Sequence, residues 1–431
     1  AAAVWIPCVH LFFAPHLQDY VDTKGIPPVA RALAKRHLAL WADAQLHAKE
    51  LDKMRGSNPE WDFMGRTFLV LALTNMGLRQ PAAKEQYLAA IDRIIDDTLR
   101  LEREKGISFF LMDYVRGGVF VSQPPRSLFI DGEIALMLGA RRMLAEKPEY
   151  RQLLTERVRV MVEYMRRSPV LSAESYPNEC WTFCNTVALA AIRIADVLDG
   201  TDHSDFIGRW LDVAKRRLVD PRTGLLVAAC TFDGSHKYGP EGSSIWMAAH
   251  CLQLVDEAFA RDQYDRAKKE LGRSLCSMLY SRVRPASWTG PMDVDSGPVV
   301  PILGASPASS GLAILGAAAF GDREFLSQLI TSLEFAAFPS ETRDGLKYCA
   351  SNQVGDAVLL YSMVLGPLWK KVEAARNTLS RLKGVRLCAQ ANTSRRPRNS
   401  RADVTAETCS PARAHGHVQL PAGCKKEVLA P

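Results

Sequence analysis

Residues 184–217 read CNTVALAAIRIADVLDGTDHSDFIGRWLDVAKRR, and this stretch decides the fold class. The first part, 184–199, is apolar on nearly every side, whereas 204–217 mixes apolar and charged residues at helical spacing. A helix that is apolar all round belongs in the interior, and an amphipathic helix covers it. The turn DGTDH between them therefore predicts a hairpin of one inner and one outer helix.

The same alternation continues along most of the chain. Apolar, Ala-rich and Gly-rich segments such as EIALMLGA and SGLAILGAAAF neighbour charged segments such as LRLEREK and YDRAKKEL. A short run, GLLVAACTF, predicts a decorating hairpin. Apolar spacings of three and four predict roughly twelve helices, at 30–54, 62–77, 83–104, 131–146, 149–167, 184–199, 204–217, 243–260, 263–282, 308–320, 322–336 and 353–375.

Alternating inner and outer helices predict an all-α protein with an (α/α)6 barrel, a toroid of about twelve helices. A right-handed solenoid of helical hairpins is the competing architecture, but no motif recurs at a fixed period. The predicted domains are an N-terminal apolar segment or linker over 1–29, the catalytic barrel over 30–372 and a basic, low-complexity tail over 373–431. In a toroid, loops at the ends of the inner helices line one central cavity.

The distribution of charge argues against a nucleic-acid-binding protein. The formal net charge is +7, but residues 381–431 hold ten Lys and Arg against three Asp and Glu. Subtracting these from the totals of 54 and 47 leaves 44 of each sign in the first 380 residues. The basic tail has little apolar periodicity and is predicted to be disordered. Since no RNP-like motif or zinc-finger spacing accompanies it, we expect no nucleic-acid partner.

The ten cysteines predict neither a zinc site nor a disulfide scaffold, because no pair has CxxC spacing. Most of them should be small buried hydrophobic residues. The opening residues AAAVWIPCVHLFFAPHL are apolar but too short to span a bilayer. They are compatible with the remnant of a signal peptide or a truncated membrane anchor, which would imply a periplasmic or membrane-associated protein; the alternative is the cytoplasm.

Polar loops that precede apolar helices supply the candidate site residues. Glu133 is either a favourable charge at a helix N-terminus or an acid that faces the cavity with a raised pKa. Asp293 and Asp295 stand two apart in a Gly/Pro-rich loop, where they could bind a polar group or cap a turn. His236 and Tyr238 could transfer protons or lie exposed on the surface.

The densest of these loops is YPNECWTFCN over 176–185. Cys180 and Cys184 are four residues apart and share one face if the helix begins that early. A thiol near a helix N-terminus has its thiolate stabilised by the helix dipole, and nearby glutamates would oppose this. The alternative is a pair of buried structural thiols. Trp61, Trp181 and Trp246 are core residues or, if they face the cavity, make it suited to a hydrophobic ligand.

Residues 176–226, beginning YPNECWTFCN and ending DPRTGLL, resemble the linalool dehydratase/isomerase family. The shared features are a Pro-containing loop, Cys-Asn at the start of an apolar helix, a Gly-Thr-Asp turn, a Trp-Leu-Asp helix and an Asp-Pro-x-x-Gly turn. The resemblance covers about 30–372 and is most specific in 171–224. It implies an (α/α)6 barrel, a homo-oligomer and acid/base chemistry around a terpene-alcohol pocket, and we expect no metal and no cofactor.

The resemblance assigns roles residue by residue. Cys184 corresponds to one catalytic cysteine of the family, the one before Asn. The second lies nine residues upstream, where this chain has Ser175, and Cys180 is the other candidate for its role. The family histidine corresponds to Glu133, and the aspartate of the first helix corresponds to Asp43.

Two tyrosines expected from the resemblance have no counterpart. The first falls near residues 65–67 and the second within 241–244, and neither range contains a tyrosine. The chain is therefore interpreted as a divergent relative whose substrate differs from that of the founding enzyme or whose catalytic acids have other pKa requirements.

The leading hypothesis is an enzyme, an acid/base lyase or isomerase that acts on a small apolar or hydroxylated, terpenoid-like molecule. Its predicted catalytic residues are Glu133, Cys180, Cys184, Asp43 and Asp293. Its predicted substrate contacts are Trp61, Asp62, Ser175, Trp181, His236, Tyr238, Glu241, Trp246 and Asp295. The partners expected are the substrate, a second copy of the chain and, through the N-terminal segment, a membrane surface.

Two other hypotheses remain at this stage. A carbohydrate-active (α/α)6 enzyme (glycoside hydrolase, lyase or epimerase) would use paired carboxylates drawn from Glu133, Glu241, Asp293 and Asp295. A non-enzymatic helical scaffold would have its cavity filled by side chains. Carboxylates that face each other beside an aromatic platform would favour a sugar, whereas thiols in a dry apolar pocket would favour a terpenoid.

Overall fold

The structure, a computed structural model, describes residues 5, 7–22, 25–290 and 296–393. The chain divides into two units, 1–381 and 382–431. The helices and strands named below belong to the first unit, except for the end of the last helix, α16. Every helix of the described part is too short or too polar to cross a membrane.

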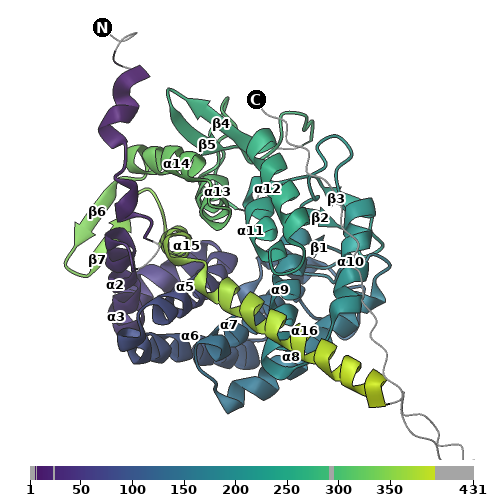
Figure 1. Cartoon of the computed structure of the whole chain (residues 1–431). Helices are drawn as coiled ribbons and strands as arrows, with labels where there is room; N and C mark the ends of the chain where they lie inside the picture. The colour runs from purple at the N-terminus through teal and green to yellow at the C-terminus, as the bar shows by residue number, and fades with distance from the viewer. Residues whose placement is uncertain (1–4, 6, 23–24, 291–295, 394–431) are drawn as a thin grey trace, which may run out of the picture. The chain divides into compact units, whose positions relative to one another are not determined.

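Six helices form a closed inner ring (Figure 1). Each contacts the next one along the chain, and the last, α15, packs against the first, α5. This closure distinguishes a toroid from an open solenoid, so the fold is the predicted (α/α)6 barrel. The inner helices are α5 (Pro59–Arg79), α7 (Leu128–Leu144), α9 (Thr182–Asp199), α11 (Gly242–Leu252), α13 (Pro307–Ala319) and α15 (Gln353–Val364).

An outer helix precedes each inner helix. The outer helices are amphipathic: α10, for example, buries Phe206, Ile207 and Trp210 and exposes most of its charged residues. Burial of one apolar stripe against the inner ring is what holds such a helix in place. The outer helices are α2 (Pro28–Ala42), α6 (Lys84–Lys105), α8 (Pro148–Arg167), α10 (Ser204–Arg217), α12 (Glu257–Leu271) and α14 (Arg323–Ala336).

Short elements connect these helices. Three antiparallel sheets lie in the connections: β1 (Cys180–Trp181), β2 (Ala229–Cys230) and β3 (His236–Tyr238); β4 (Gly272–Leu275) and β5 (Met278–Ser281); β6 (Pro339–Thr342) and β7 (Gly345–Tyr348). The remaining helical elements are η1 (Val9–Phe13), η2 (Leu17–Asp19), α3 (Ala44–His47), η3 (Ala48–Asp52), α4 (Lys53–Ser57), η4 (Pro81–Ala83), η5 (Ile107–Phe110), η6 (Asp113–Gly117) and α16 (Pro367–Thr393).

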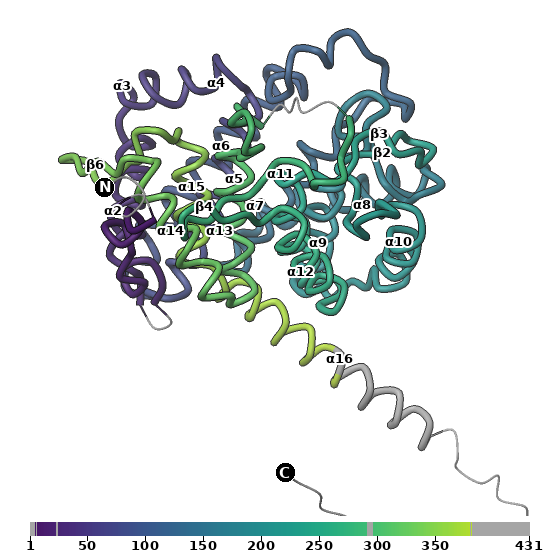
Figure 2. Tube along the Cα trace, turned by 90° about the horizontal axis from the view of Figure 1, so that it is seen from above, coloured from purple at the N-terminus to yellow at the C-terminus, as the bar shows by residue number. Residues whose placement is uncertain are grey.

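All six inner helices begin at the same end of the barrel, because each outer helix carries the chain back. Close contacts between α7 and α9 confirm this direction: a Cβ at Gly132 would lie 3.4 Å from the Cys184 carbonyl, and one at Gly139 would meet Ile194. Residues near the start of α7 therefore lie beside residues near the start of α9, and residues near the end of α7 lie beside residues near the end of α9. Figure 2 shows α7, α9 and α11 side by side.

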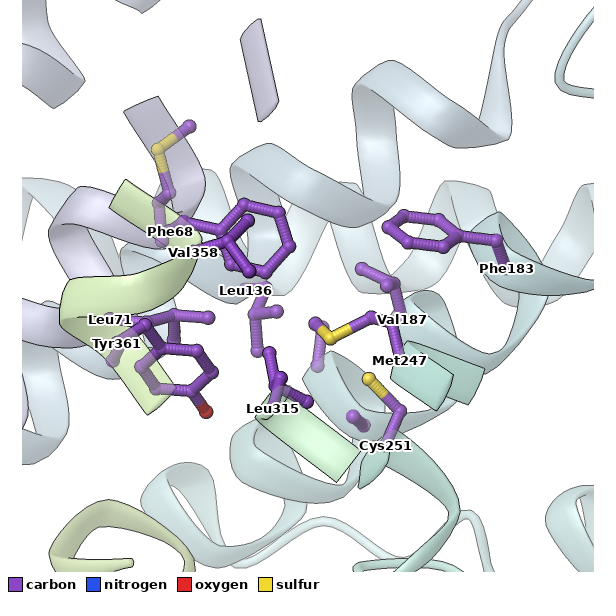
Figure 3. Close-up of a cluster of buried hydrophobic side chains, with 14 of the residues drawn as sticks. Phe68, Leu71, Leu136, Phe183, Val187, Met247, Cys251, Leu315, Val358 and Tyr361 are labelled. Carbon is purple, nitrogen blue, oxygen red and sulfur yellow. The ribbon is translucent and has the colours of Figure 1, made fainter. Parts of the chain in front are cut away.

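The axis of the ring is filled by apolar side chains from all six inner helices (Figure 3). Polar groups that face the axis must therefore lie towards the ends of the helices. The labelled members of this axial cluster are Phe68, Leu71, Leu136, Phe183, Val187, Met247, Cys251, Leu315, Val358 and Tyr361.

One predicted helix, at 263–282, is wrong in its second half. Helix α12 ends at Leu271, and the following residues form the β4–β5 hairpin. Cys276 and Ser277 have positive φ values of 49° and 61°, which close a tight turn that no helix contains. The apolar spacing that predicted a helix here also fits a short strand, because Leu279 is buried in β5 while its neighbours are partly exposed.

Three further predicted helices are interrupted. The segment 243–260 breaks after Leu252, where α11 ends, and Asp256 caps α12, which begins at Glu257. The segment 30–54 breaks at Asp43, whose carboxylate accepts hydrogen bonds from the backbone N–H groups of Gln45 and Leu46 and caps α3. The segment 353–375 breaks at Gly366, whose φ is +113°, before Pro367 opens α16. Helix α16 runs through residue 372, the predicted domain boundary, to Thr393. The remainder of the predicted tail lies outside the described residues.

The close approach of α7 and α9 yields a test of the packing. Gly132→Leu places three extra carbon atoms beyond Cβ against the α9 backbone, so we expect the free energy of unfolding to fall by about 1–3 kcal/mol. Gly208→Leu on outer helix α10 is the matched control, because a Cβ there meets nothing within 4 Å. Thermal unfolding of both variants measures the difference, and equal midpoints would contradict the packing.

Candidate active site

Glu133 lies on the first part of α7 with its side chain almost wholly buried. Loss of hydration raises the pKa of this carboxyl from about 4.5 to about 8, and the negative charge of Glu60 adds to the rise. Thr67 on α5 opposes part of the shift. Glu133 Oε2 nevertheless has no hydrogen-bond partner of ordinary geometry among the described residues, and the same holds for the Thr67 hydroxyl.

Cys184, on α9, lies near the Glu133 carboxyl. Burial raises the pKa of its thiol, and the charges of Glu133 and Glu60 raise it further, so all three groups lie within electrostatic reach of one another. The thiol is therefore neutral at physiological pH. Ser175, in the loop before β1, is close enough to Cys184 to oppose part of this shift. The Ser175 hydroxyl is buried and has no hydrogen-bond partner of ordinary geometry in the described chain.

Glu60 stands in the first turn of α5 and is only partly buried. Its carboxylate accepts a hydrogen bond from the Tyr176 hydroxyl, and the Tyr176 oxygen in turn accepts one from the backbone N–H of Met112 at 2.8 Å. Burial and the Glu60 charge raise the pKa of Tyr176, which stays protonated. Tyr114 stacks on Tyr176 with ring centroids 4.8 Å apart. The site thus has a charged, tyrosine-bound carboxylate on its outer side.

Helical periodicity explains why these groups converge. Thr67, Glu133 and Cys184 each lie three or four residues before a member of the axial cluster: Leu71, Leu136 and Val187 respectively. Residues three and four apart share a helix face. The three polar groups therefore lie one turn above the apolar cluster of Figure 3, on the side where the inner helices begin.

The rim of this site carries some of the other predicted residues. Trp181 and Tyr238 lie ring to ring at 5.5 Å, and Glu179 binds the Trp181 indole N–H at 3.0 Å and pairs with Lys237 at 2.9 Å. Trp61, partly exposed at the start of α5, has its ring 3.8 Å from the position a Cβ would take at Gly297.

Several predicted residues lie elsewhere. Asp43 is an exposed helix cap, and Asp62 faces Arg66, with 3.1 Å between its Oδ1 and the Arg66 Nε. Trp246 is buried between α12 and α14, where its rings contact Tyr264 and Phe325.

Three more predicted residues also have other partners. His236 is exposed and donates a ring N–H to the Arg217 carbonyl at 2.7 Å. Glu241 is buried against Arg284, with 3.3 Å between its Oε2 and a guanidinium nitrogen. Cys180 faces Cys230 on β2. Asp293 and Asp295 lie outside the described residues.

Sequence reasoning missed Glu60, Thr67 and Tyr176. The loop NPEWDF drew attention to Trp61 and Asp62, but the helical repeat over Glu60, Thr67 and Leu71 was the available signal. Those three residues share one face of α5, and that face meets the axis. Tyr176 could not be placed, because nothing local links it to a glutamate 116 residues away.

The site contains no cluster of three or more His, Cys, Asp or Glu side chains placed to hold a metal ion, within the residues described. Its elements are a buried protonated carboxyl, a neutral thiol, two buried hydroxyls and a carboxylate bound by tyrosine. Together with the closed ring of helical hairpins, these groups define an (α/α)6-barrel protein with a candidate site at the end where its inner helices begin.

Comparisons with known proteins identify the family. The family model for linalool dehydratase/isomerase matches residues 136–354, about half of the chain, and this span includes Ser175 and Cys184. The chain belongs to the linalool dehydratase/isomerase family. Glu133 lies three residues before the matched span, and Glu60 and Thr67 lie well before it.

Three solved structures are similar in fold to this chain at low sequence identity. The GH76 α-mannanase of Bacteroides thetaiotaomicron is 12% identical over 72% of this chain and 87% of its own, with a TM-score of 0.46. The GH76A α-1,6-mannanase of Salegentibacter sp. HEL1_6 is 11% identical over 78% and 98%, with a TM-score of 0.47. Unsaturated glucuronyl hydrolase of Bacillus sp. GL1 is 12% identical over 78% and 94%, also at 0.47. Similarity at these identities and TM-scores gives no information about the substrate of this chain.

The raised pKa of Glu133 predicts a pH-dependent stability. The carboxyl ionises near pH 4.5 in the unfolded chain and near pH 8 in the folded one, so the folded state holds an extra proton between these values. Stability is therefore lost as the pH rises through this window. We expect Glu133→Gln to gain stability relative to wild type by a few kcal/mol between pH 5 and pH 8, since each pKa unit corresponds to about 1.4 kcal/mol.

Urea unfolding of wild type and Glu133→Gln at a series of pH values measures this difference. Asp92→Asn serves as a control, because the pKa of Asp92, which is paired with Arg141, is lowered and its effect on stability has the opposite sign. A difference between wild type and Glu133→Gln that does not change with pH would show that Glu133 titrates normally.

Proposed function

We propose that this chain is an acid/base lyase or isomerase that acts on a small, largely apolar alcohol or the corresponding alkene. The observation that supports this proposal best is the buried Glu133 carboxyl. Its pKa of about 8 keeps it protonated at neutral pH, and one of its oxygens has no described partner. A neutral acid in a dry site is suited to protonating a poor leaving group such as a hydroxyl.

The reaction follows from the protonation states. The Glu133 proton passes to the substrate hydroxyl oxygen, the C–O bond breaks, and water leaves together with the bonding electron pair. The carbocation that remains is stabilised by the new negative charge on Glu133 and by the charge of Glu60. The Glu133 carboxylate then removes a proton from a neighbouring carbon, which forms the alkene and restores the acid. Return of water to a different carbon would give isomerisation instead.

The neutral Cys184 thiol and the Ser175 and Thr67 hydroxyls have the chemistry to orient the reacting oxygen. All three are buried, and both hydroxyls lack described hydrogen-bond partners, so a substrate hydroxyl or the departing water would satisfy them. Because the pKa of Cys184 is raised, we assign the thiol a hydrogen-bonding role rather than that of a thiolate nucleophile.

The apolar neighbours of these groups favour a hydrocarbon substrate. The cluster directly below them includes Leu136, Val187 and Met247, and Phe183 stands next to Cys184 near the start of α9; none of the labelled members is charged (Figure 3). Such a wall would accommodate the carbon skeleton of a terpenoid and would leave the hydroxyls of a sugar without partners. The carboxylate of Glu241, a candidate for sugar hydrolysis, is paired with Arg284.

Substitution of the acid tests the proposal. We expect Glu133→Gln to lower kcat for dehydration of a tertiary or allylic alcohol by about 10²–10⁴-fold, because the amide cannot donate a proton of comparable acidity. Asp356→Asn is the matched control: Asp356 is also buried with its pKa raised, to about 7, but it contacts the backbone of Tyr348 and not the site. Alkene formation by gas chromatography measures the rate. Similar losses in both variants, or unchanged turnover in Glu133→Gln, would refute the role of Glu133.

The thiol has its own test. Cys184→Ala should lower kcat by about tenfold or more and leave the fold intact, because the substrate hydroxyl loses one hydrogen-bond donor. Thr186→Val on the same helix is the control, since the Thr186 hydroxyl is bound to the helix backbone at Thr182 and Phe183. Its turnover should stay within about twofold of wild type.

The pH profile provides an independent prediction. Because the acid must be protonated, kcat/KM for dehydration should be constant around neutral pH and fall tenfold per unit above about pH 8. Initial rates measured between pH 6 and pH 10 test this, with circular dichroism at each pH to exclude unfolding. A rate that rises towards alkaline pH would indicate a thiolate or carboxylate base instead.

A further inference from the structure

Cys180 and Cys230 face each other across the short antiparallel pair β1–β2, and both thiols are free. Their Cα atoms are register partners, which in antiparallel strands places them about 4.5–5.5 Å apart. A disulfide requires a Cα separation of about 4.4–6.8 Å. The backbone of the two strands therefore already has the spacing that a cross-strand disulfide needs.

The local hydrogen bonds give the two thiols different reactivity. The Cys180 Sγ donates to the Ser172 carbonyl at 3.3 Å, and the Cys230 Sγ lies 3.8 Å from the Cys180 carbonyl. The neighbouring Cys180 side chain lowers the pKa of the Cys230 thiol, whereas the Cys230 side chain and burial raise the pKa of Cys180. Cys230 is therefore the thiol that ionises first and attacks first.

Solvent can reach the Cys180–Cys230 pair from the side of the turn that follows β2. Both side chains are buried, but β2 ends at Cys230 and leads into the turn over 231–235, whose tip at Asp233 and Ser235 is exposed. Local opening of this turn would bring Cys230 to solvent without disturbing the helices. Cys184 also lies within electrostatic reach of Cys180, but it faces Ser175 and Glu133 on the side of the candidate active site.

We propose that Cys180 and Cys230 form a redox-active pair that closes into a cross-strand disulfide when a small-molecule disulfide is present. The Cys230 thiolate attacks one sulfur of the reagent, which forms a mixed disulfide and releases one thiol. The Cys180 thiolate then attacks the Cys230 sulfur and releases the second thiol. The two cysteines lose two electrons and two protons, and the reagent is reduced to two thiols.

Closure of this disulfide would affect the strand that leads into the candidate active site. β1 ends at Trp181, and α9, with Cys184 in its first turn, begins at the next residue. A covalent link between β1 and β2 would hold this junction and restrict the unfolded chain. The pair is thus a modification site beside the candidate active site, and its existence does not depend on the function proposed above.

Peptide mapping of the full-length protein tests the proposal. The protein is treated with oxidised glutathione, alkylated under denaturing conditions, digested with trypsin without reduction and analysed by mass spectrometry. We expect peptide 168–193 to be joined to peptide 223–237, with a mass lower than the sum of the two by two hydrogen atoms, and dithiothreitol should separate them. Recovery of both peptides fully alkylated, or each bound only to glutathione, would overturn the proposal.

Variants identify the partner, because peptide 168–193 contains both Cys180 and Cys184. The cross-link should persist in Cys184→Ser and disappear in Cys180→Ser and in Cys230→Ser. Loss in Cys184→Ser with persistence in Cys180→Ser would overturn the assignment. As a second readout, oxidised glutathione should raise the midpoint of thermal unfolding of wild type by a few degrees and leave that of Cys230→Ser unchanged. An unchanged wild-type midpoint would contradict the proposed restraint.

Discussion

The close packing of α7 against α9 is the contact on which the site depends. Gly132 lets the backbones of these helices approach within van der Waals distance at Cys184 and Ala188, and Gly139 leaves room for the Ile194 side chain. A Cβ at the first position would already touch the α9 backbone, so a side chain that extends beyond Cβ would push the helices apart at the level of Glu133. Because Glu133 follows Gly132 directly, the contact that brings the backbones together also sets the carboxyl beside the Cys184 thiol. The packing of α7 against α9 and the position of the Glu133 carboxyl therefore depend on the same residues near the start of the two helices.

The electrostatics of the barrel set Glu133, like Asp356, apart from most of the buried carboxylates. Asp62 is paired with Arg66, Asp131 with Arg126 and Arg157, and Glu241 with Arg284. Glu174 accepts backbone hydrogen bonds from Val121, Ser122 and Asn178. Glu133 has neither an ion pair nor such a cradle within the described chain, and instead faces the negative Glu60. A carboxyl in this setting stays protonated and costs stability at neutral pH, which is the usual signature of a residue retained for function.

Much of the fold could be predicted from the sequence, because inner and outer helices differ in composition. Segments such as 184–199 are apolar all round, and in the structure the corresponding helix, α9, is buried over most of its length. The prediction failed where apolar spacing fits two structures, as at 272–281, and where a single cap interrupts a periodic run, as at Asp43. Helix periodicity measures which residues share a face, but a turn is decided by one or two backbone angles.

The site could be predicted only in part, for a related reason. Glu133 and Cys184 were predicted because they stand at the entrances of inner helices, and Ser175 because the resemblance places a cysteine there; the structure brings these three together. Asp62 and Glu241 occupy similar positions in sequence but pair with arginines: Asp62 with Arg66, one turn further along the same helix, and Glu241 with Arg284, in a later connection. Which side of a helix entrance faces the axis depends on helix register. That register follows from contacts such as Gly132 with Cys184, which only the folded chain contains.

The replacement implied by the family resemblance has a physical consequence. A glutamate stands where the resemblance places a histidine, and its burial raises its pKa to about 8, close to the range in which an imidazole titrates. The charge states differ, however. A histidine is cationic before it donates its proton and neutral afterwards, whereas Glu133 is neutral before and negative afterwards. In the proposed reaction this negative product state would stabilise a carbocation next to it, so the same buried carboxyl that costs stability in the resting protein would lower the energy of the charged intermediate.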